Sequence, residues 1–254
     1  MKILENTHID KRFIEIDIAR GIAVVMMIVY HLLFDLWFFS LYSIPVTTGF
    51  WKYFAGATAS LFLLLVGISV TISAAHAENI LSRRDFYLKF IRRGIAILLI
   101  AAGITLATWW YLGGEGFVIF GILDLIGVSI ILAPLFFHRG KKTLVASAIV
   151  IIVGLLLVQV RGPAYLIPIG IFPESFYSVD YTPVFPWFGL VLAGIFLGET
   201  LYPGGRRVFS VPDFPGKGRL FSLPATILSF LGRHSLIIYI VHQPVIILFL
   251  HPPF

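Results

Sequence analysis

The sequence predicts an all-α, polytopic integral membrane protein with about seven transmembrane helices. Hydrophobic residues make up 59% of its 254 residues and charged residues only 13%, whereas soluble domains contain roughly 45–50% apolar and about 25% charged residues. Seven apolar runs are long enough to be membrane spans. They cover residues 18–39, 53–75, 91–111, 117–137, 143–160, 184–201 and 234–250.

The distribution of lysine and arginine predicts the orientation of these spans. All but two of the 19 basic residues fall on the side of the membrane that holds the N-terminus, and the exceptions are Lys52 and Arg161. Cytoplasmic loops carry such an excess of positive charge. We therefore predict a cytoplasmic N-terminus and an external C-terminus, with one transmembrane domain over residues 1–254.

Composition also excludes several classes of protein. The net charge is +6, but the basic residues lie in short blocks between apolar runs, so we predict no nucleic-acid binding. Because the chain has no cysteine, it has no thiol nucleophile and no cysteine-ligated metal. We find no metal-ligand motif, phosphate-binding loop or nucleophile elbow. No lysine lies inside a span, which argues against a retinal protein.

The first span carries four ionisable residues on one side. Asp17, Arg20, His31 and Asp35 form a single stripe at 100° per residue. Ionisable groups at membrane depth are costly unless they face protein or water, and they often mark functional sites. The alternative is that Asp17 and Arg20 lie at the water interface, while His31 and Asp35 form a buried structural pair.

Two further polar residues are predicted near the depth of His31. Asp124 and His242 each lie within roughly 5 Å of that depth when the spans are centred on the bilayer. A carboxylate four residues after a histidine can orient its ring, so Asp35 is predicted to hold His31 as a general base. Asp124 and His242 would position an acceptor or relay a proton. A structural hydrogen bond between helices is the alternative for His242.

Two aromatic residues are candidates for binding substrate. Tyr239 lies on the His242 side of the last span, and Trp187 either belongs to the interfacial aromatic belt or lines the site. The proline-rich residues 161–183 predict an ordered external loop or a re-entrant cap, and residues 202–219 predict a flexible, turn-rich loop. The small residues Gly189, Ala193, Gly194 and Gly198 indicate close helix packing.

Five segments resemble those of a known family, in the same order. They are RFIEIDIARGIAVVMMIVYH, FLLLVGIS, FGILDLIGVSIIL, YTPVFPWFGLVLAGIFLGE and LGRHSLIIYIVHQPVI. They are similar to the transmembrane acyltransferases related to the catalytic domain of lysosomal heparan-alpha-glucosaminide N-acetyltransferase, through its short prokaryotic relatives. The spacing of Arg20 and His31 also resembles that of the wider membrane acyltransferases that decorate surface polysaccharides.

The resemblance implies a multi-pass protein of a prokaryotic plasma membrane that moves an acyl group, usually acetyl, from cytosolic acyl-CoA to a sugar, glycan or lipid. Asp17, Arg20 and Gly21 match the opening motif of the family. The closing motif is matched by His234, Ser235, His242 and Gln243. In the lysosomal enzyme the catalytic histidine lies in the first non-cytoplasmic loop, whereas SLYSIPVTTGFWKYF contains none. His31 would therefore have to take that role from within the helix.

The sequence leads to one favoured function and two alternatives. The favoured one is an acyltransferase with His31, Asp35, Asp124 and His242 in catalysis, and with Trp187, Tyr239 and Gln243 binding substrate. Acetyl-CoA would be a co-substrate, no cofactor would be permanently bound, and direct transfer and an acyl-histidine intermediate both remain open. The alternatives are a proton-coupled transporter or channel and a haem-b electron carrier with His31 and His242 as axial ligands.

The predicted CoA site lies at the cytoplasmic end. The phosphates of CoA need cationic donors, and the candidates are Arg20, Arg92, Arg93 and Arg233. Arg20 is the best of them because the helix rises about 16 Å from Arg20 to His31, a length similar to an extended pantetheine arm. The alternative is that these arginines only set the topology. The acceptor, the acyl chain and the oligomeric state stay open.

Overall fold

The computed structural model describes residues 13–210 and 219–250. Within these ranges the chain is helical and has no strand, which confirms the all-α prediction. The helices are α1 Ile14–Phe38, α2 Gly49–Glu78, α3 Arg83–Tyr111, α4 Ile122–Leu132, α5 Lys141–Leu157, α6 Val184–Leu201, α7 Arg219–Arg233 and α8 Ser235–Leu250, with the short 3-10 helices η1 Ala133–Leu135, η2 Ala164–Ile169 and η3 Pro203–Gly205.

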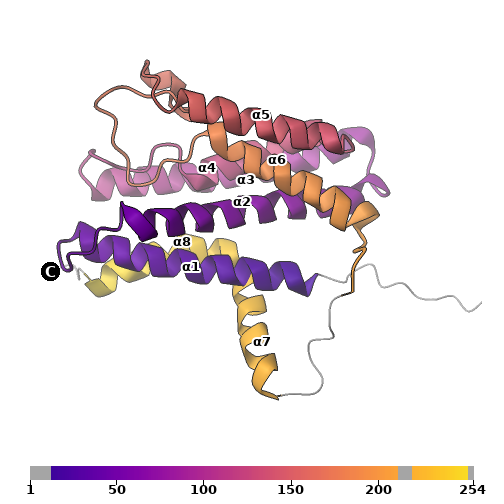
Figure 1. Ribbon diagram of the computed structural model, residues 1–254, viewed down its shortest axis with the longest axis horizontal. Coiled ribbons are helices and arrows are strands. Elements are labelled where there is room, and N and C mark those ends of the chain that lie inside the picture. The colour runs from indigo at the N-terminus through magenta and orange to yellow at the C-terminus, as the bar shows by residue number, and fades with distance from the viewer. Residues whose placement is uncertain (1–12, 211–218, 251–254) are drawn as a thin grey trace, which may run out of the picture. The chain divides into compact units, whose positions relative to one another are not determined.

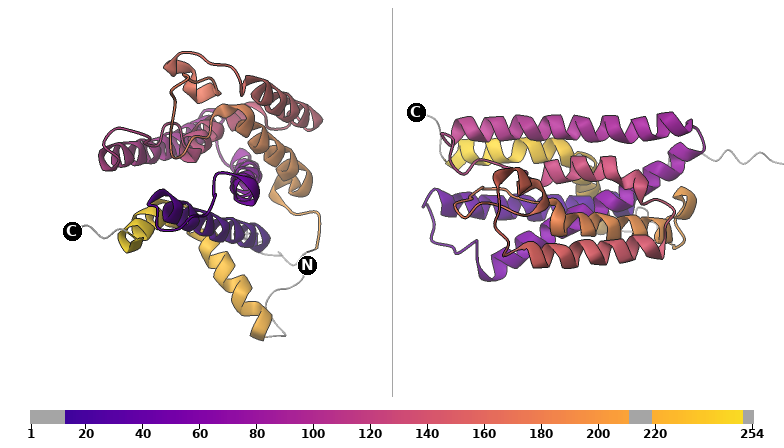
Figure 2. Two further views of the ribbon diagram at one scale, coloured as in Figure 1. Left: turned by 60° about the vertical axis from the view of Figure 1, so that its left-hand side comes forward. Right: turned by 90° about the horizontal axis from the view of Figure 1, so that it is seen from above.

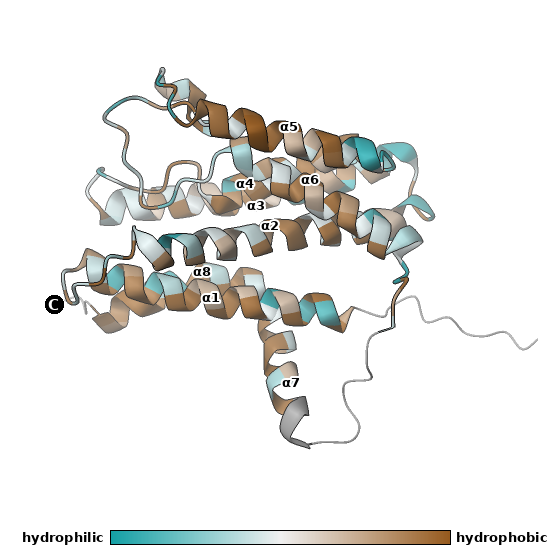
Figure 3. Cartoon of the chain, in the orientation of Figure 1, coloured by the Kyte–Doolittle hydropathy of each residue, from teal (hydrophilic) through white to brown (hydrophobic). Residues whose placement is uncertain are grey.

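Each predicted apolar run overlaps a helix, and the longest helices qualify as membrane spans. In the described part of the chain, α1, α2, α3 and α6 are long and apolar enough to cross a bilayer, and α7 with α8 forms a bent pair that counts as a fifth candidate. The apolar helix Ile122–Leu135 is shorter. Figure 3 shows that hydrophobic residues cover most of α5 and α8. The protein is thus a polytopic membrane protein, whereas the count of seven spans and the orientation stay predictions.

The chain folds as two compact units. The first comprises the described residues up to Thr58 and those from Arg219 onwards, and the second is Ala59–Ser210. The division falls inside α2. The predicted single domain over residues 1–254 stays a prediction.

The first unit is built from α1, α7 and α8. Helix α7 packs across α1, and α8 packs beside α1 (Figure 1). A Cβ added at Gly21 would overlap the carbonyl of Leu228, and one added at Gly232 would overlap the carbonyl of Asp17. The two backbones therefore touch because both crossing points are glycine. Helix α7 was not predicted from the sequence, which indicated a loop at residues 202–219 and the next span at 234–250. Of the predicted loop, residues 211–218 lie outside the described part of the chain.

The second unit is held together by glycine-mediated helix contacts. Helices α5 and α6 pack side by side, as do α3 and α4 (Figure 2). A Cβ at Gly67 of α2 or at Gly194 of α6 would meet the backbone of the other helix. Ser147 Oγ donates to the carbonyl oxygen of Gly189 at 2.7 Å. The predicted close packing along the small-residue series of α6 is therefore confirmed.

The proline-rich connection before α6 is ordered, as predicted. The hydroxyl of Tyr181 donates to the carbonyl oxygen of Ile167 at 2.7 Å, and burial raises the pKa of Tyr181 to about 12. The Arg161 guanidinium lies 4.5 Å from the centre of the Phe172 ring. These contacts, rather than regular helix, give the loop a defined shape.

Candidate functional site

Two histidine rings meet in the first unit. His31 lies in the C-terminal half of α1 and His242 in the middle of α8. Their ring centres are 4.8 Å apart, and the ring planes are inclined at 74°. Both helices have the apolar composition of membrane helices. His31 and His242, which were predicted to lie at a similar depth in the membrane, thus contact each other.

The hydrogen bonds of the two rings determine which nitrogen carries the proton. His31 Nδ1 lies 2.9 Å from the Met27 carbonyl oxygen, and His242 Nδ1 lies 2.7 Å from that of Tyr239. A carbonyl oxygen can only accept, so each Nδ1 is the N–H donor. In neutral imidazole, the Nε2 atom then carries a lone pair. His242 Nε2 is buried and has no hydrogen-bond partner in the described part of the chain.

Asp35 does not orient His31, which corrects the sequence prediction. Its two carboxylate oxygens accept from Gln243 Nε2, at 2.8 Å and 2.9 Å, and only 2% of the residue is exposed. The i, i+4 spacing does place Asp35 one turn after His31, but His31 Nδ1–H already bonds within its own helix. The amide of α8 therefore takes the carboxylate, and Asp35 ties α1 to α8 one turn from the histidines.

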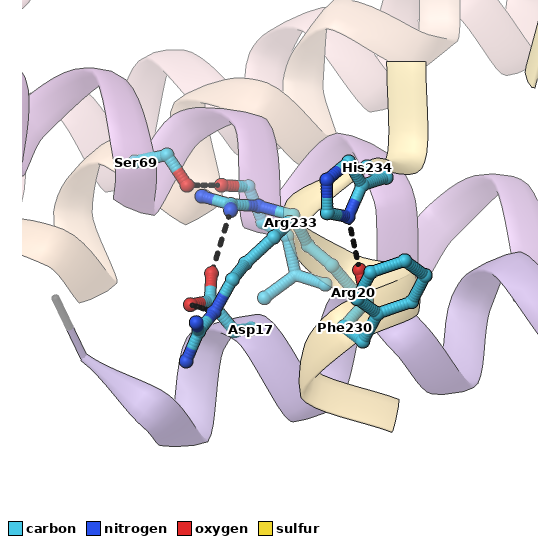
Figure 4. A network of polar contacts seen from close by, with 7 residues as sticks. Asp17, Arg20, Ser69, Phe230, Arg233 and His234 are labelled. Carbon is cyan, nitrogen blue, oxygen red and sulfur yellow. Dashed lines mark hydrogen bonds and ion pairs between the residues drawn. The ribbon is translucent and has the colours of Figure 1, made fainter. Parts of the chain in front are cut away.

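A second polar cluster lies near the start of α1. Arg20 Nη1 is 3.1 Å from one Asp17 carboxylate oxygen, and Arg233 Nε is 3.3 Å from the other. Figure 4 shows both arginines beside Asp17, with His234 against Phe230. Only 5% of Asp17 is exposed, whereas 47% of the Arg233 side chain is exposed. One carboxylate between two guanidinium groups leaves an excess of positive charge, which suits an anion.

Asp124 has a different setting from the one predicted. Helix α4 begins at Ile122 rather than at 117, so Asp124 lies in its first turn and not at mid-span. Its carboxylate accepts from the Gly121 backbone N–H at 3.0 Å. This is a helix-capping interaction, which accounts for the residue structurally.

The other predicted site residues are divided between the units. Tyr239 and Gln243 lie in α8 beside His242. Arg92 and Arg93 are exposed residues of α3, and Trp187 packs at the edge of the hydrophobic core formed by the second unit. The first unit therefore brings together His31, Asp35, His242, Gln243, Tyr239, Arg20 and Arg233.

Sequence reasoning missed three parts of this arrangement. It assigned no role to the Met27 carbonyl, no partner for Asp35 on α8, and no function to Asp17 as the bridge between Arg20 and Arg233. Asp17 could have been found, because it stands three residues before Arg20 on the same helix face. The other two depend on which side chains α8 presents, and the sequence pattern carries no signal for that.

The histidine pair does not fit the haem alternative. A haem held by two histidines lies between its ligands, with the porphyrin plane separating the two rings. The rings of His31 and His242 are in edge contact instead, with centres 4.8 Å apart. The two rings therefore leave no space between them for a haem.

Comparison with known proteins identifies the family. Residues 12–244 match the family described as heparan-alpha-glucosaminide N-acetyltransferase, catalytic. The comparisons with curated proteins and with solved structures gave no match. The matched range contains both polar clusters of the first unit and nearly the whole chain. The chain therefore belongs to the heparan-alpha-glucosaminide N-acetyltransferase catalytic family, and this membership supports a membrane acetyltransferase-type function.

Proposed function

We propose that this protein transfers an acetyl group from acetyl-CoA to a hydroxyl or amine of a glycan or lipid at the plasma membrane of a prokaryote. The observation that carries the proposal is the contact between His31 and His242, with each Nδ1 within hydrogen-bond distance of a backbone carbonyl. In the neutral rings, this arrangement leaves each Nε2 as the atom that can take up a proton. A base with a fixed tautomer in an apolar setting is suited to removing a proton from an acceptor.

In the proposed reaction, His31 Nε2 removes the proton of the acceptor as the acceptor attacks the thioester carbonyl. The carbon–sulfur bond then breaks, and CoA leaves as a thiolate that takes up the proton. His242 lies close enough to share this proton. Asp35 and Gln243 act as positioning residues that hold α8 against α1. A route through an acetyl-histidine is the two-step variant of the same chemistry.

The Arg20–Asp17–Arg233 cluster supports a CoA site in the first unit. The cluster carries net positive charge, and Arg20 stands about 16 Å below His31 along α1. Phosphates held at the arginines would place the thioester of an extended pantetheine arm near the histidines. The sequence offered four arginines as candidates for binding the phosphates of CoA. Arg233 is favoured over Arg92 and Arg93 because it contacts Asp17 beside Arg20.

The second candidate function is a proton-coupled transporter. The contact between two imidazoles with unprotonated Nε2 atoms would also suit a proton relay through the membrane. Such a protein would need no acyl donor. The two functions therefore differ in whether CoA binds at all.

Labelled acetyl-CoA tests the proposed transfer. Membranes that contain the protein are expected to move radiolabelled acetate onto a glycan or lipid, whereas membranes with the His31→Ala variant are not. The labelled product, isolated and identified, gives the acceptor. If the wild-type protein leaves all label on CoA while it moves protons across vesicles, the relay function takes its place.

Arginine variants test the donor site. Arg20→Gln and Arg233→Gln are each expected to weaken acetyl-CoA binding by about 1–3 kcal/mol, because each removes a charged hydrogen-bond donor. Arg84→Gln is the matched control, since Arg84 is an exposed basic residue of α3 outside the cluster. Binding is measured by isothermal calorimetry on purified protein. Affinities of all three variants equal to wild type would exclude the cluster as the CoA site.

A further inference from the structure

Helix α7 presents an apolar side that nothing in the described chain covers. Leu223, Ile227 and Phe230 are 63%, 50% and 58% exposed. Their spacing of four and three residues puts them on one face of the helix. The opposite face rests on α1, where Leu228 and Gly232 meet the backbone of Gly21 and Asp17.

The direction of α7 shows what this apolar side faces. The axis bends by 87° between Leu223–Arg233 and the apolar helix α8, as Figure 1 shows for the first unit. Helix α8 packs beside the candidate span α1, and a helix at right angles to the direction of a span runs along the plane of the membrane. It crosses α1 at Asp17 and Gly21, near the start of the span and beside the charged cluster. The end of a membrane span lies near the boundary between head groups and acyl chains.

The charges at the ends of α7 fit the same surface. The helix begins at Arg219 and ends at Arg233, and Lys217 precedes it in the sequence. Basic residues flanking an apolar helix face are attracted to anionic phospholipids, at roughly 1 kcal/mol per residue near the surface. No acidic residue lies within the helix. Charge and hydrophobicity therefore favour a lipid surface over a soluble partner.

We propose that α7 is an in-plane helix that binds the phospholipid bilayer at its head-group boundary. Leu223, Ile227 and Phe230 enter the acyl-chain region, and the basic sequence that flanks the helix favours a surface with anionic head groups. Because Arg233 ends this helix and contacts Asp17, the lipid-bound helix also keeps Arg233 in the charged cluster. The proposal does not depend on acetyl transfer.

Single-cysteine labelling tests the proposal, because the chain has no cysteine of its own. Leu223→Cys, Ile227→Cys and Phe230→Cys are each labelled with bimane and reconstituted in vesicles of phosphatidylcholine with about 30% phosphatidylglycerol. Asn79→Cys, in the polar turn after α2, is the water-exposed control. Leu99→Cys, on the exposed side of α3, is the lipid-exposed control.

All three α7 labels are expected to be quenched by spin-labelled lipid with the nitroxide near the head group. Iodide in the water is expected to quench them several-fold less than the label at position 79. Iodide quenching equal to that at position 79 would overturn the proposal. Cross-linking of position 227 between two copies in the same vesicles would also overturn it, since a second copy would then cover the face. Vesicles without phosphatidylglycerol should show increased iodide quenching, and no increase would refute the role of the basic residues.

Discussion

Replacing His31 by alanine is expected to lower the rate of acetyl transfer by about 10²–10⁴-fold, the usual contribution of a general base. Acetyl-CoA affinity should stay close to wild type, because the charged cluster lies about 16 Å along α1 from the ring. The measurement is a turnover assay with labelled acetyl-CoA, paired with calorimetric binding. A loss in turnover without a loss in binding marks an interaction made in the chemical step.

Asp35→Asn is the comparison variant for this experiment. Asp35 accepts a hydrogen bond from Gln243 and makes none with His31. The Asp35→Asn substitution should therefore reduce turnover less than His31→Ala does. His31→Ala with wild-type turnover would rule out both the general base and the acetyl-histidine. Equal losses in the two variants, together with reduced CoA binding, would indicate that His31 only supports the packing of α1 on α8.

Gly232→Ala is expected to destabilise the first unit by roughly 1–3 kcal/mol, the usual cost of forcing extra atoms into a packed contact. The new methyl group would overlap the carbonyl of Asp17, and backbone atoms cannot turn aside as a flexible side chain can. Helix α7 must then move away from α1, which also separates Arg233 from Asp17. We expect a lower midpoint of thermal unfolding in detergent and weaker acetyl-CoA binding.

Gly103→Ala is the matched control. Gly103 also lies inside a helix, but a Cβ there meets nothing within 4 Å, and alanine is the better helix former by about 1 kcal/mol. This variant should be as stable as wild type or more so. Gly232→Ala with the unfolding midpoint of Gly103→Ala would show that α7 does not pack tightly on α1.

The structure departs from the sequence predictions where side-chain direction or helix ends decide the outcome. Asp35 was assigned to His31 because the two are neighbours on one helix face, but the amide of Gln243 on another helix occupies its oxygens. Asp124 was placed near the depth of His31 because the apolar run begins at 117, yet Gly116 and Phe120 have positive φ angles and α4 starts only at Ile122. Helix α7 was not predicted, because the sequence indicated a turn-rich loop at residues 202–219 and the next apolar span only at 234–250, and no element was assigned between them.

The sequence by itself determined that this is a helical membrane protein, where its apolar runs lie, and that His31 and His242 share a depth. These conclusions follow from hydrophobicity and from the rise and period of a helix, which are local properties. Only the tertiary structure decided that the two rings touch, that each Nδ1–H is bound to a carbonyl, that Asp35 pairs with Gln243 and that Asp17 joins Arg20 to Arg233. Contacts between helices distant in the sequence depend on rotation and crossing geometry, and here the glycines at positions 21 and 232 permit the close crossing of α1 and α7.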